Sequence, residues 1–106
     1  MKAHDNPVLQ RFRAGLNEAF GDRVARVVLY GSRARGDARP DSDYDVAVFL
    51  RDIPDRIAEL YRLADLSTAI LEDTGECIHA TAYEAKTYDD PRMPLMHEIR
   101  REGVDL

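Results

Sequence analysis

The chain has 106 residues and a formal net charge of −5 at pH 7, with a pI near 5.1. Since a nucleic-acid-binding domain usually carries a basic face, this charge argues against direct contact with nucleic acid. One domain, residues 1–106, is expected, with a single hydrophobic core and little material for a second substrate-binding domain. The single cysteine excludes an intrachain disulfide, and no stretch resembles a signal peptide or membrane span, so we expect a cytoplasmic protein without membrane contact.

The first half of the chain predicts a helix followed by a strand. Asn6 is a favourable N-cap, Pro7 suits the first helical position, and apolar residues then recur at helical spacing until Gly21. Residues 24–30 are apolar and rich in β-branched side chains, which is typical of a buried strand. Residues 33–42 form a polar connection rich in arginine and aspartate, with room for one helical turn at its start.

The second half predicts a strand, a long helix, another strand and a final helix. Residues 44–50 form the strand, and residues 52–55 open the helix, which ends before Gly75. The apolar positions of this helix keep a helical period: Ile57, Leu60, Leu63, Ala64, Ile70 and Leu71. Residues 76–83 form the next strand, and the last helix begins at a proline, residue 91 or 94, and ends at residue 102.

This order of elements predicts an α/β (α+β) fold, a small mixed sheet of three to four strands with helices on one face. Strand parity assigns side chains to the two faces of the sheet. In the second strand, four side chains share the side that meets the helices: Tyr44, Val46, Val48 and Leu50. The other side carries Asp43 and Asp45, followed by Ala47 and Phe49. We expect that face to be open and to present the two carboxylates.

Asp43 and Asp45 lie two residues apart on a strand and therefore project together. Two carboxylates so close repel each other unless a cation lies between them. Because Mg2+ prefers carboxylate and phosphate oxygens, this pair suits a magnesium ion held jointly with a triphosphate. The alternative is that both aspartates belong only to a solvated turn that leads into the strand.

Gly31 and Ser32 directly follow the first predicted strand. A glycine there lets a phosphate approach the backbone, and the serine hydroxyl adds a hydrogen-bond donor. A helical turn that begins there also directs its free N–H groups at an anion. Because a Gly-Ser pair alone is common in ordinary turns, the prediction depends on the spacing, in which ten residues separate Ser32 from Asp43.

The combined pattern resembles the signature of the DNA polymerase beta superfamily of nucleotidyltransferases, which is Gly-Ser, ten residues, then Asp-x-Asp. The segment GSRARGDARPDSDYDVAVF is most similar to the stand-alone minimal nucleotidyltransferases of bacteria and archaea. The detailed motif covers residues 28–50, and the order of elements and the ending HEIRREGVDL extend the resemblance along the chain. The resemblance implies a polymerase-beta-type nucleotidyltransferase fold.

The resemblance also implies a role for each matching residue. Gly31 and Ser32 match the residues that hold the β- and γ-phosphates of ATP, and Asp43 and Asp45 match those that bind Mg2+. Such groups stabilise charge while an acceptor attacks the α-phosphate in line and pyrophosphate leaves.

Arg33 and Arg35 match arginines that are often found after the Gly-Ser pair in this superfamily. The resemblance implies that both bind the nucleotide, by steadying its phosphates, or that they steady the acceptor. Exposed arginines in a polar loop also commonly do no more than increase solubility. Both interpretations stay open for these two side chains.

The third carboxylate that active members of the superfamily usually carry on the next core strand is not evident. Glu76 is the only carboxylate on that predicted strand, but it shares the side of Ile78, which we expect to be buried. His79 lies on the other side and should point toward the aspartates. A neutral imidazole is a good general base but a poor ligand for Mg2+, so His79 is the candidate third catalytic residue, or an exposed histidine without a role. Cys77 is expected to be a packing residue.

The resemblance therefore implies a magnesium-dependent nucleotidyltransferase, and we expect it to transfer AMP from ATP to a partner protein. Similar minimal nucleotidyltransferases are often paired with a HEPN-domain toxin, an RNase, which they neutralise as antitoxins by adenylylating it. The short chain favours an acceptor supplied by that partner in a hetero-oligomer. A second interpretation is a weak or inactive domain that neutralises the toxin by binding alone, and a third is a structural protein with a coincidental motif.

Overall fold

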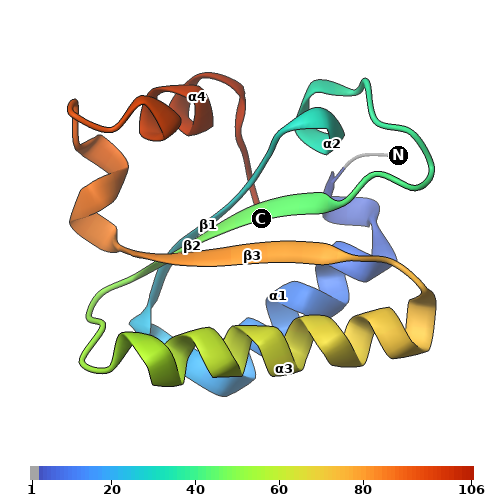
Figure 1. Ribbon diagram of the computed structural model, residues 1–106, viewed down its shortest axis with the longest axis horizontal. Coiled ribbons are helices and arrows are strands. Elements are labelled where there is room, and N and C mark those ends of the chain that lie inside the picture. Colours follow the sequence, from blue (N-terminus) through green and yellow to red (C-terminus); the bar gives the residue numbers. More distant parts are fainter. Residues whose placement is uncertain (1–2) are drawn as a thin grey trace.

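The computed structural model describes residues 3–106. Figure 1 shows a sheet with helices on both of its sides. The α-helices and strands, in chain order, are α1 (Pro7–Phe20), β1 (Val24–Tyr30), α2 (Ser32–Arg35), β2 (Tyr44–Leu50), α3 (Arg56–Thr74), β3 (Ile78–Glu84), α4 (Pro94–Glu102) and β4 (Val104–Asp105). None of the helices within residues 3–106 has the length and apolar character needed to cross a membrane.

The sheet has four strands in the order β3-β2-β1-β4 and is mixed in direction. β1 runs antiparallel to both β2 and β4, whereas β2 and β3 run parallel. Parallel neighbours need a long crossover connection, and α3 provides it between β2 and β3. The α/β class and the small mixed sheet expected from the order of elements are confirmed.

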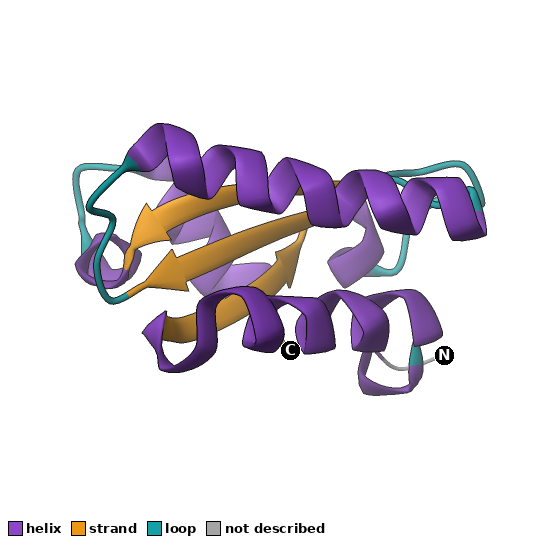
Figure 2. Ribbon diagram, turned by 90° about the horizontal axis from the view of Figure 1, so that it is seen from below, coloured by secondary structure: helices purple, strands orange, loops and turns teal. Residues whose placement is uncertain are grey.

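One face of the sheet packs on the two long helices. Figure 2 looks onto this layer, in which α1 and α3 lie side by side across the strands. The side chains that β2 contributes to this core are those that parity predicted: Tyr44, Val46, Val48 and Leu50. From β3, Ile78 is buried in the same core, as its parity also predicted.

The second face of the sheet is only partly open, which corrects the expectation of helices on one face. Figure 1 shows α4 on the side of the sheet opposite α1 and α3. Met96 and Ile99 of α4 are buried in a second core cluster with Ala47 and Phe49 of β2. Because α4 covers that part of the face, the end of the sheet near Asp45 remains accessible, and the Asp45 side chain is 33% exposed.

Capping residues set the ends of the two long helices. The Asn6 side chain accepts hydrogen bonds from the backbone N–H groups of Val8, at 2.9 Å, and Leu9, at 3.2 Å, as predicted for an N-cap. Asp55, the last residue of the predicted opening segment, is the N-cap of α3, and Gly75 ends that helix in the left-handed conformation. Local sequence therefore determines where these helices begin and end.

α3 buries a different stripe from the one that its apolar residues indicated. Leu63 and Ile70 are buried as expected, and so is Glu59, at 3% exposure, whose carboxylate lies 2.9 Å from Arg23 Nη2. Positions 59, 63 and 70 share one side of a helix, and only that side meets the rest of the core. Four predicted apolar positions are instead exposed: Ile57 by 65%, Leu60 by 56%, Leu71 by 45%, and also Ala64.

Two adjacent residues of α3 test this packing. Ile70→Ala should lower the free energy of unfolding by about 2–5 kcal/mol, because it opens a cavity in the core. Leu71→Ala should change it by less than about 0.5 kcal/mol, because that side chain is exposed. Urea unfolding followed by circular dichroism measures both values, and equal losses would contradict the assigned face of the helix.

Candidate active site

The two aspartates lie at the start of β2, on the face opposite α1 and α3. Asp43 immediately precedes the strand and is exposed, and Asp45 is the second residue of the strand. In the sheet, Asp45 lies between Tyr30 of β1 and His79 of β3. The sheet therefore presents both carboxylates at one of its ends, with a neighbouring strand on each side of Asp45.

The turn after β1 lies directly against Asp45. Gly31 has a φ of +74°, a conformation that favours glycine, and a Cβ atom there would lie 2.5 Å from Asp45 Oδ2. Ser32 follows as the first residue of α2. Because Tyr30 pairs with Asp45 in the sheet, the turn that begins at Gly31 comes to lie against the Asp45 carboxylate.

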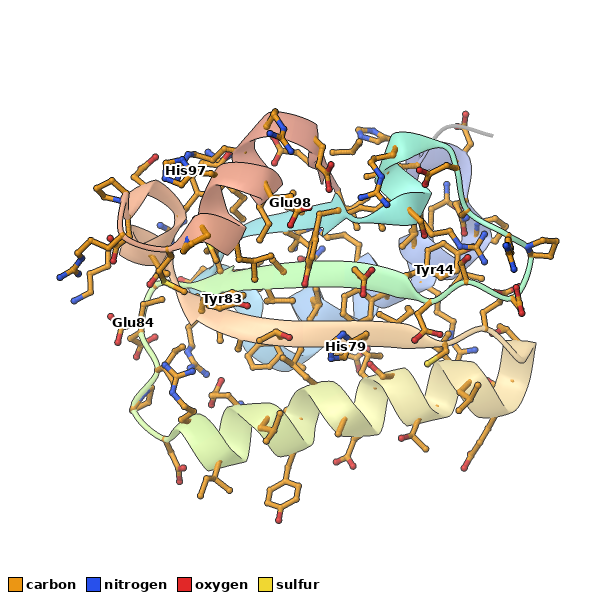
Figure 3. All side chains as sticks on the ribbon, turned by 45° about the horizontal axis from the view of Figure 1, so that its top comes forward. Tyr44, His79, Tyr83, Glu84, His97 and Glu98 are labelled. Carbon is orange, nitrogen blue, oxygen red and sulfur yellow. The ribbon has the colours of Figure 1, made fainter. Side chains whose placement is uncertain are left out.

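His79 lies beside Asp45 on the same face of the sheet. Its Nδ1 is 3.5 Å from Asp45 Oδ1, and its side chain is 68% exposed. Figure 3 shows it on the edge strand β3. The parity argument that directed His79 toward the aspartates is confirmed, and its exposure leaves the imidazole accessible to a bound ligand.

Glu76 does not supply a third carboxylate. It precedes β3 rather than lying on it, and its Oε2 is 3.6 Å from Arg33 Nη2. Within residues 3–106, no three His, Cys, Asp or Glu side chains are grouped so that they could hold a metal ion. Mg2+ commonly takes one or two protein carboxylates and completes its shell with phosphate oxygens and water. Asp43 and Asp45 therefore fit a magnesium ion that arrives with a nucleotide better than a permanent metal centre.

Cys77 is not the packing residue that we expected. Its side chain is exposed and lies before β3, close to Asp43. Local loss of solvation raises the pKa of the thiol, and the neighbouring carboxylate raises it further. The thiol therefore keeps its proton at neutral pH, which argues against a thiolate nucleophile at this position.

Tyr30 is a site residue that sequence reasoning missed. Burial, followed by the charges of Tyr83, Asp45 and Glu98, raises the pKa of its phenol to about 12. Tyr30 thus keeps its proton at neutral pH and is available as a hydrogen-bond donor beside the carboxylates. Figure 3 shows Glu98 on α4, over the same face of the sheet. The sequence offered one signal for a role of Tyr30, its position directly before Gly31. That position is equally well explained as the last residue of a buried strand.

The two predicted nucleotide-binding arginines have different surroundings. The Arg33 side chain is 18% exposed and turns toward the loop before β2, where it donates to the Ser42 carbonyl. The Arg35 side chain is 43% exposed and lies 3.2 Å from both Asp37 and Glu102. Its hydrogen bond to Asp37 raises the pKa of Arg35, so it stays charged. Of these two arginines, only Arg35 has a guanidinium that a bound nucleotide could reach.

A cavity of about 910 Å3 lies behind α2 rather than over the aspartates. Its walls include Leu29 and Tyr44, which belong to the core face that α1 and α3 cover. Neither aspartate lines it. Cavity volume therefore does not mark the candidate site, which is an accessible surface at the end of the sheet.

The family of this chain follows from its sequence. Residues 9–95 match the profile of the nucleotidyltransferase domain family, and this span includes the Gly31-Ser32 turn, both aspartates and His79. The chain therefore belongs to the nucleotidyltransferase domain family. The resemblance to the minimal nucleotidyltransferases of the polymerase beta superfamily is confirmed.

Solved structures share the fold. A crystal structure of a toxin–antitoxin with AMP-PNP superposes with a TM-score of 0.66 and 18% identity, over 91% of this chain and 69% of that chain. A structure provisionally described as a minimal nucleotidyltransferase superposes with a TM-score of 0.62 and 27% identity, over 100% of this chain and 97% of that chain. The low identity limits the first likeness to the fold.

Two proteins of Methanocaldococcus jannaschii are similar in sequence, and both are provisionally named protein adenylyltransferases. They share 34% identity over 47 residues and 33% identity over 58 residues, respectively. These alignments cover 44% and 55% of this chain but 48% and 40% of the relatives. The chain thus spans less than half the length of either relative.

Two glycines with positive φ test the contact with Asp45. Gly31→Ala should lower the affinity for magnesium and the ATP analogue AMP-PNP by about 10–100-fold, because its Cβ would displace the Asp45 carboxylate. Gly36→Ala is the matched control, because its φ is +84° but nothing lies within 4 Å of the new Cβ. Both variants should lose about 1–3 kcal/mol of stability from backbone strain. Calorimetric titration measures the affinities, and equal affinities would contradict the contact.

Proposed function

We propose that the chain is a magnesium-dependent adenylyltransferase that transfers AMP from ATP to a partner protein. The observation that carries this proposal is the contact between the Gly31 turn and Asp45, since it joins a phosphate-binding turn to a carboxylate pair that fits Mg2+. Membership of the nucleotidyltransferase domain family supports the reaction type. The names of the two archaeal relatives support a protein as the acceptor.

We assign each group at this end of the sheet to one part of the magnesium–nucleotide complex. Asp43 and Asp45 would hold magnesium, while the Gly31 backbone and the Ser32 hydroxyl would hold the β- and γ-phosphates. When bound, the ion supplies positive charge that stabilises the phosphates in the transition state. The acceptor oxygen forms a bond to the α-phosphorus, the bond from that phosphorus to the bridging oxygen breaks, and pyrophosphate leaves.

His79 is the residue that we assign to the acceptor proton. Its Nδ1 faces Asp45 at 3.5 Å, which leaves Nε2 for the acceptor hydroxyl. The carboxylate orients the ring, in the way that a second group commonly orients a catalytic imidazole. This assignment gives the site a base without the third carboxylate.

Arg35 is the arginine that we assign to a phosphate or to the acceptor. It follows Ser32 by one helical turn, and its side chain is 43% exposed. Its partners Asp37 and Glu102 each lie 3.2 Å from the guanidinium and restrain it beside α2. A guanidinium recognises phosphate through two parallel hydrogen bonds, so a bound nucleotide is a stronger partner than an exposed carboxylate.

A HEPN-domain toxin is the partner that we propose, with this chain as its antitoxin in a hetero-oligomer. The toxin–antitoxin crystal structures that share the fold support this pairing, and one of them was solved with AMP-PNP. The open surface around the aspartates also suits an acceptor as large as a protein.

The second candidate function is neutralisation of the toxin by binding alone. The observation that favours it is that Asp43 and Asp45 lack a third carboxylate partner, since no group of three His, Cys, Asp or Glu side chains among residues 3–106 could hold a metal. Co-expression and purification with the partner separate the two functions. A tight complex without AMP on the partner would support binding alone and contradict the transferase.

A pair of aspartates in the same segment tests the transferase. Asp43→Asn should lower the rate of AMP transfer from labelled ATP by at least about 10²–10³-fold, because it removes a charged ligand from the reacting phosphates. Asp41→Asn removes the same charge from an exposed position of the loop and should leave the rate unchanged. Transfer that survives in Asp43→Asn would contradict the proposed metal site.

Two exposed histidines test the proposed base. His79→Ala should lower the maximal rate of transfer by about 10²–10⁴-fold at neutral pH, with little change in nucleotide affinity. His97→Ala, on α4, is the control and should behave as the wild type. Rates come from a time course of labelled AMP on the partner, and an unchanged rate in His79→Ala would exclude the histidine as the base.

A further inference from the structure

The guanidinium of Arg33 donates hydrogen bonds to the loop that leads to Asp43. Arg33 Nε donates to the Ser42 carbonyl at 3.2 Å, and Nη2 donates to the same carbonyl at 2.8 Å. Nη2 also donates to the Pro40 carbonyl at 3.2 Å. Hydrogen bonds from a charged donor are stronger than those between neutral groups, so these contacts hold the loop firmly.

The same guanidinium also contacts the residue on the other side of Asp43. Its Cζ lies 4.2 Å from the centroid of the Tyr44 ring, a distance typical of a cation–π contact. The Tyr44 hydroxyl in turn accepts a hydrogen bond from Asn6 Nδ2 at 3.0 Å. Arg33 therefore contacts both neighbours of Asp43, the Ser42 carbonyl before it and the Tyr44 ring after it.

Arg33 is also the next residue after Ser32 in the chain. One side chain thus links the turn that would hold phosphates to the backbone that would present a metal ligand. The loop between them has few bonds of its own: Ser42 N donates to the Arg39 carbonyl at 3.0 Å, Arg39 N donates to Ser42 Oγ at 2.9 Å, and Asp37 N donates to the Ser32 carbonyl at 3.2 Å. Arg33 adds the contacts that join this loop to the residues on both sides of Asp43. Without the Arg33 contacts, this polar segment would have more freedom, and Asp43 would move with it.

We infer that Arg33 is a positioning residue, which fixes Asp43 for metal binding instead of contacting the nucleotide. The inference rests on the proposed function for the identity of the metal-binding group. Its low exposure, 18%, and its existing contacts oppose the phosphate contact that the resemblance implied. A phosphate contact would require Arg33 to leave two loop carbonyls and an aromatic ring.

The test compares Arg33→Met with Arg39→Met, which removes the same charge from an exposed arginine of the same loop. The first readout is the affinity for Mn2+, used as a paramagnetic probe of the magnesium site, in the presence of AMP-PNP. The second is the affinity for AMP-PNP in the presence of a chelator. Arg33→Met should weaken Mn2+ binding by about 10–100-fold, as loss of a residue that orients a metal ligand commonly does, and leave the metal-free affinity unchanged. Arg39→Met should change neither.

Arg33→Lys is the second variant. A lysine keeps the charge but cannot donate to two carbonyls and stack on a ring together, so it should recover only part of the Mn2+ affinity. Circular dichroism establishes that each variant is folded. Equal losses of AMP-PNP affinity with and without metal would overturn the inference and assign Arg33 to the phosphates. Unchanged Mn2+ affinity in Arg33→Met would also overturn the inference.

Hydrogen exchange separates failure of this inference from failure of the proposed function. The Ser42 amide should exchange faster in Arg33→Met than in the wild type, and at the wild-type rate in Arg39→Met. If the Ser42 amide exchanges faster in Arg33→Met but the wild type binds no Mn2+, the proposed function is refuted. Arg33 would then still be the residue that orders Asp43. Unchanged exchange would refute the positioning role whatever the metal result.

Discussion

The antiparallel pairing of β1 with β2 places the Gly31 turn, at the end of β1, against the Asp45 carboxylate, near the start of β2. Because Tyr30 lies opposite Asp45, the glycine after Tyr30 comes so close to the carboxylate that a single methyl group would collide with it. The positive φ of Gly31, the direction of α2 and the course of the loop back to β2 all depend on this register. A shift by one residue would send Asp45 into the core between the sheet and the long helices.

The sequence predicted those parts of the fold that local chemistry determines. The N-cap at Asn6 and the glycine that ends α3 act within one helical turn, so their residue types were sufficient. Parity along β2 placed Asp45 on the accessible face, and parity along β3 placed His79 beside it. The site could be predicted to this extent because alternation in a strand is a geometric property of the backbone.

The remaining features depend on contacts between distant segments. The outward turn of Leu60 follows from the burial of Glu59, which is stable only because Arg23, 36 residues earlier, reaches it. The position of α4 on the second face follows from the fit of its apolar side chains to Phe49, and a helical period does not specify which face receives the helix. The inward turn of Arg33 likewise depends on two carbonyls near the end of the loop and on the Tyr44 ring that follows it.

The exposed thiol beside Asp43 has a practical consequence. Cys77 is the only cysteine of the chain, so a thiol-directed fluorophore or spin label would attach at one place without any prior substitution. The raised pKa of this thiol means that coupling proceeds best at mildly alkaline pH, where more of the sulfur is ionised. A label at that position lies next to Asp43, one of the two carboxylates proposed to hold the cation, so its spectrum would respond to occupancy of the site in the native sequence.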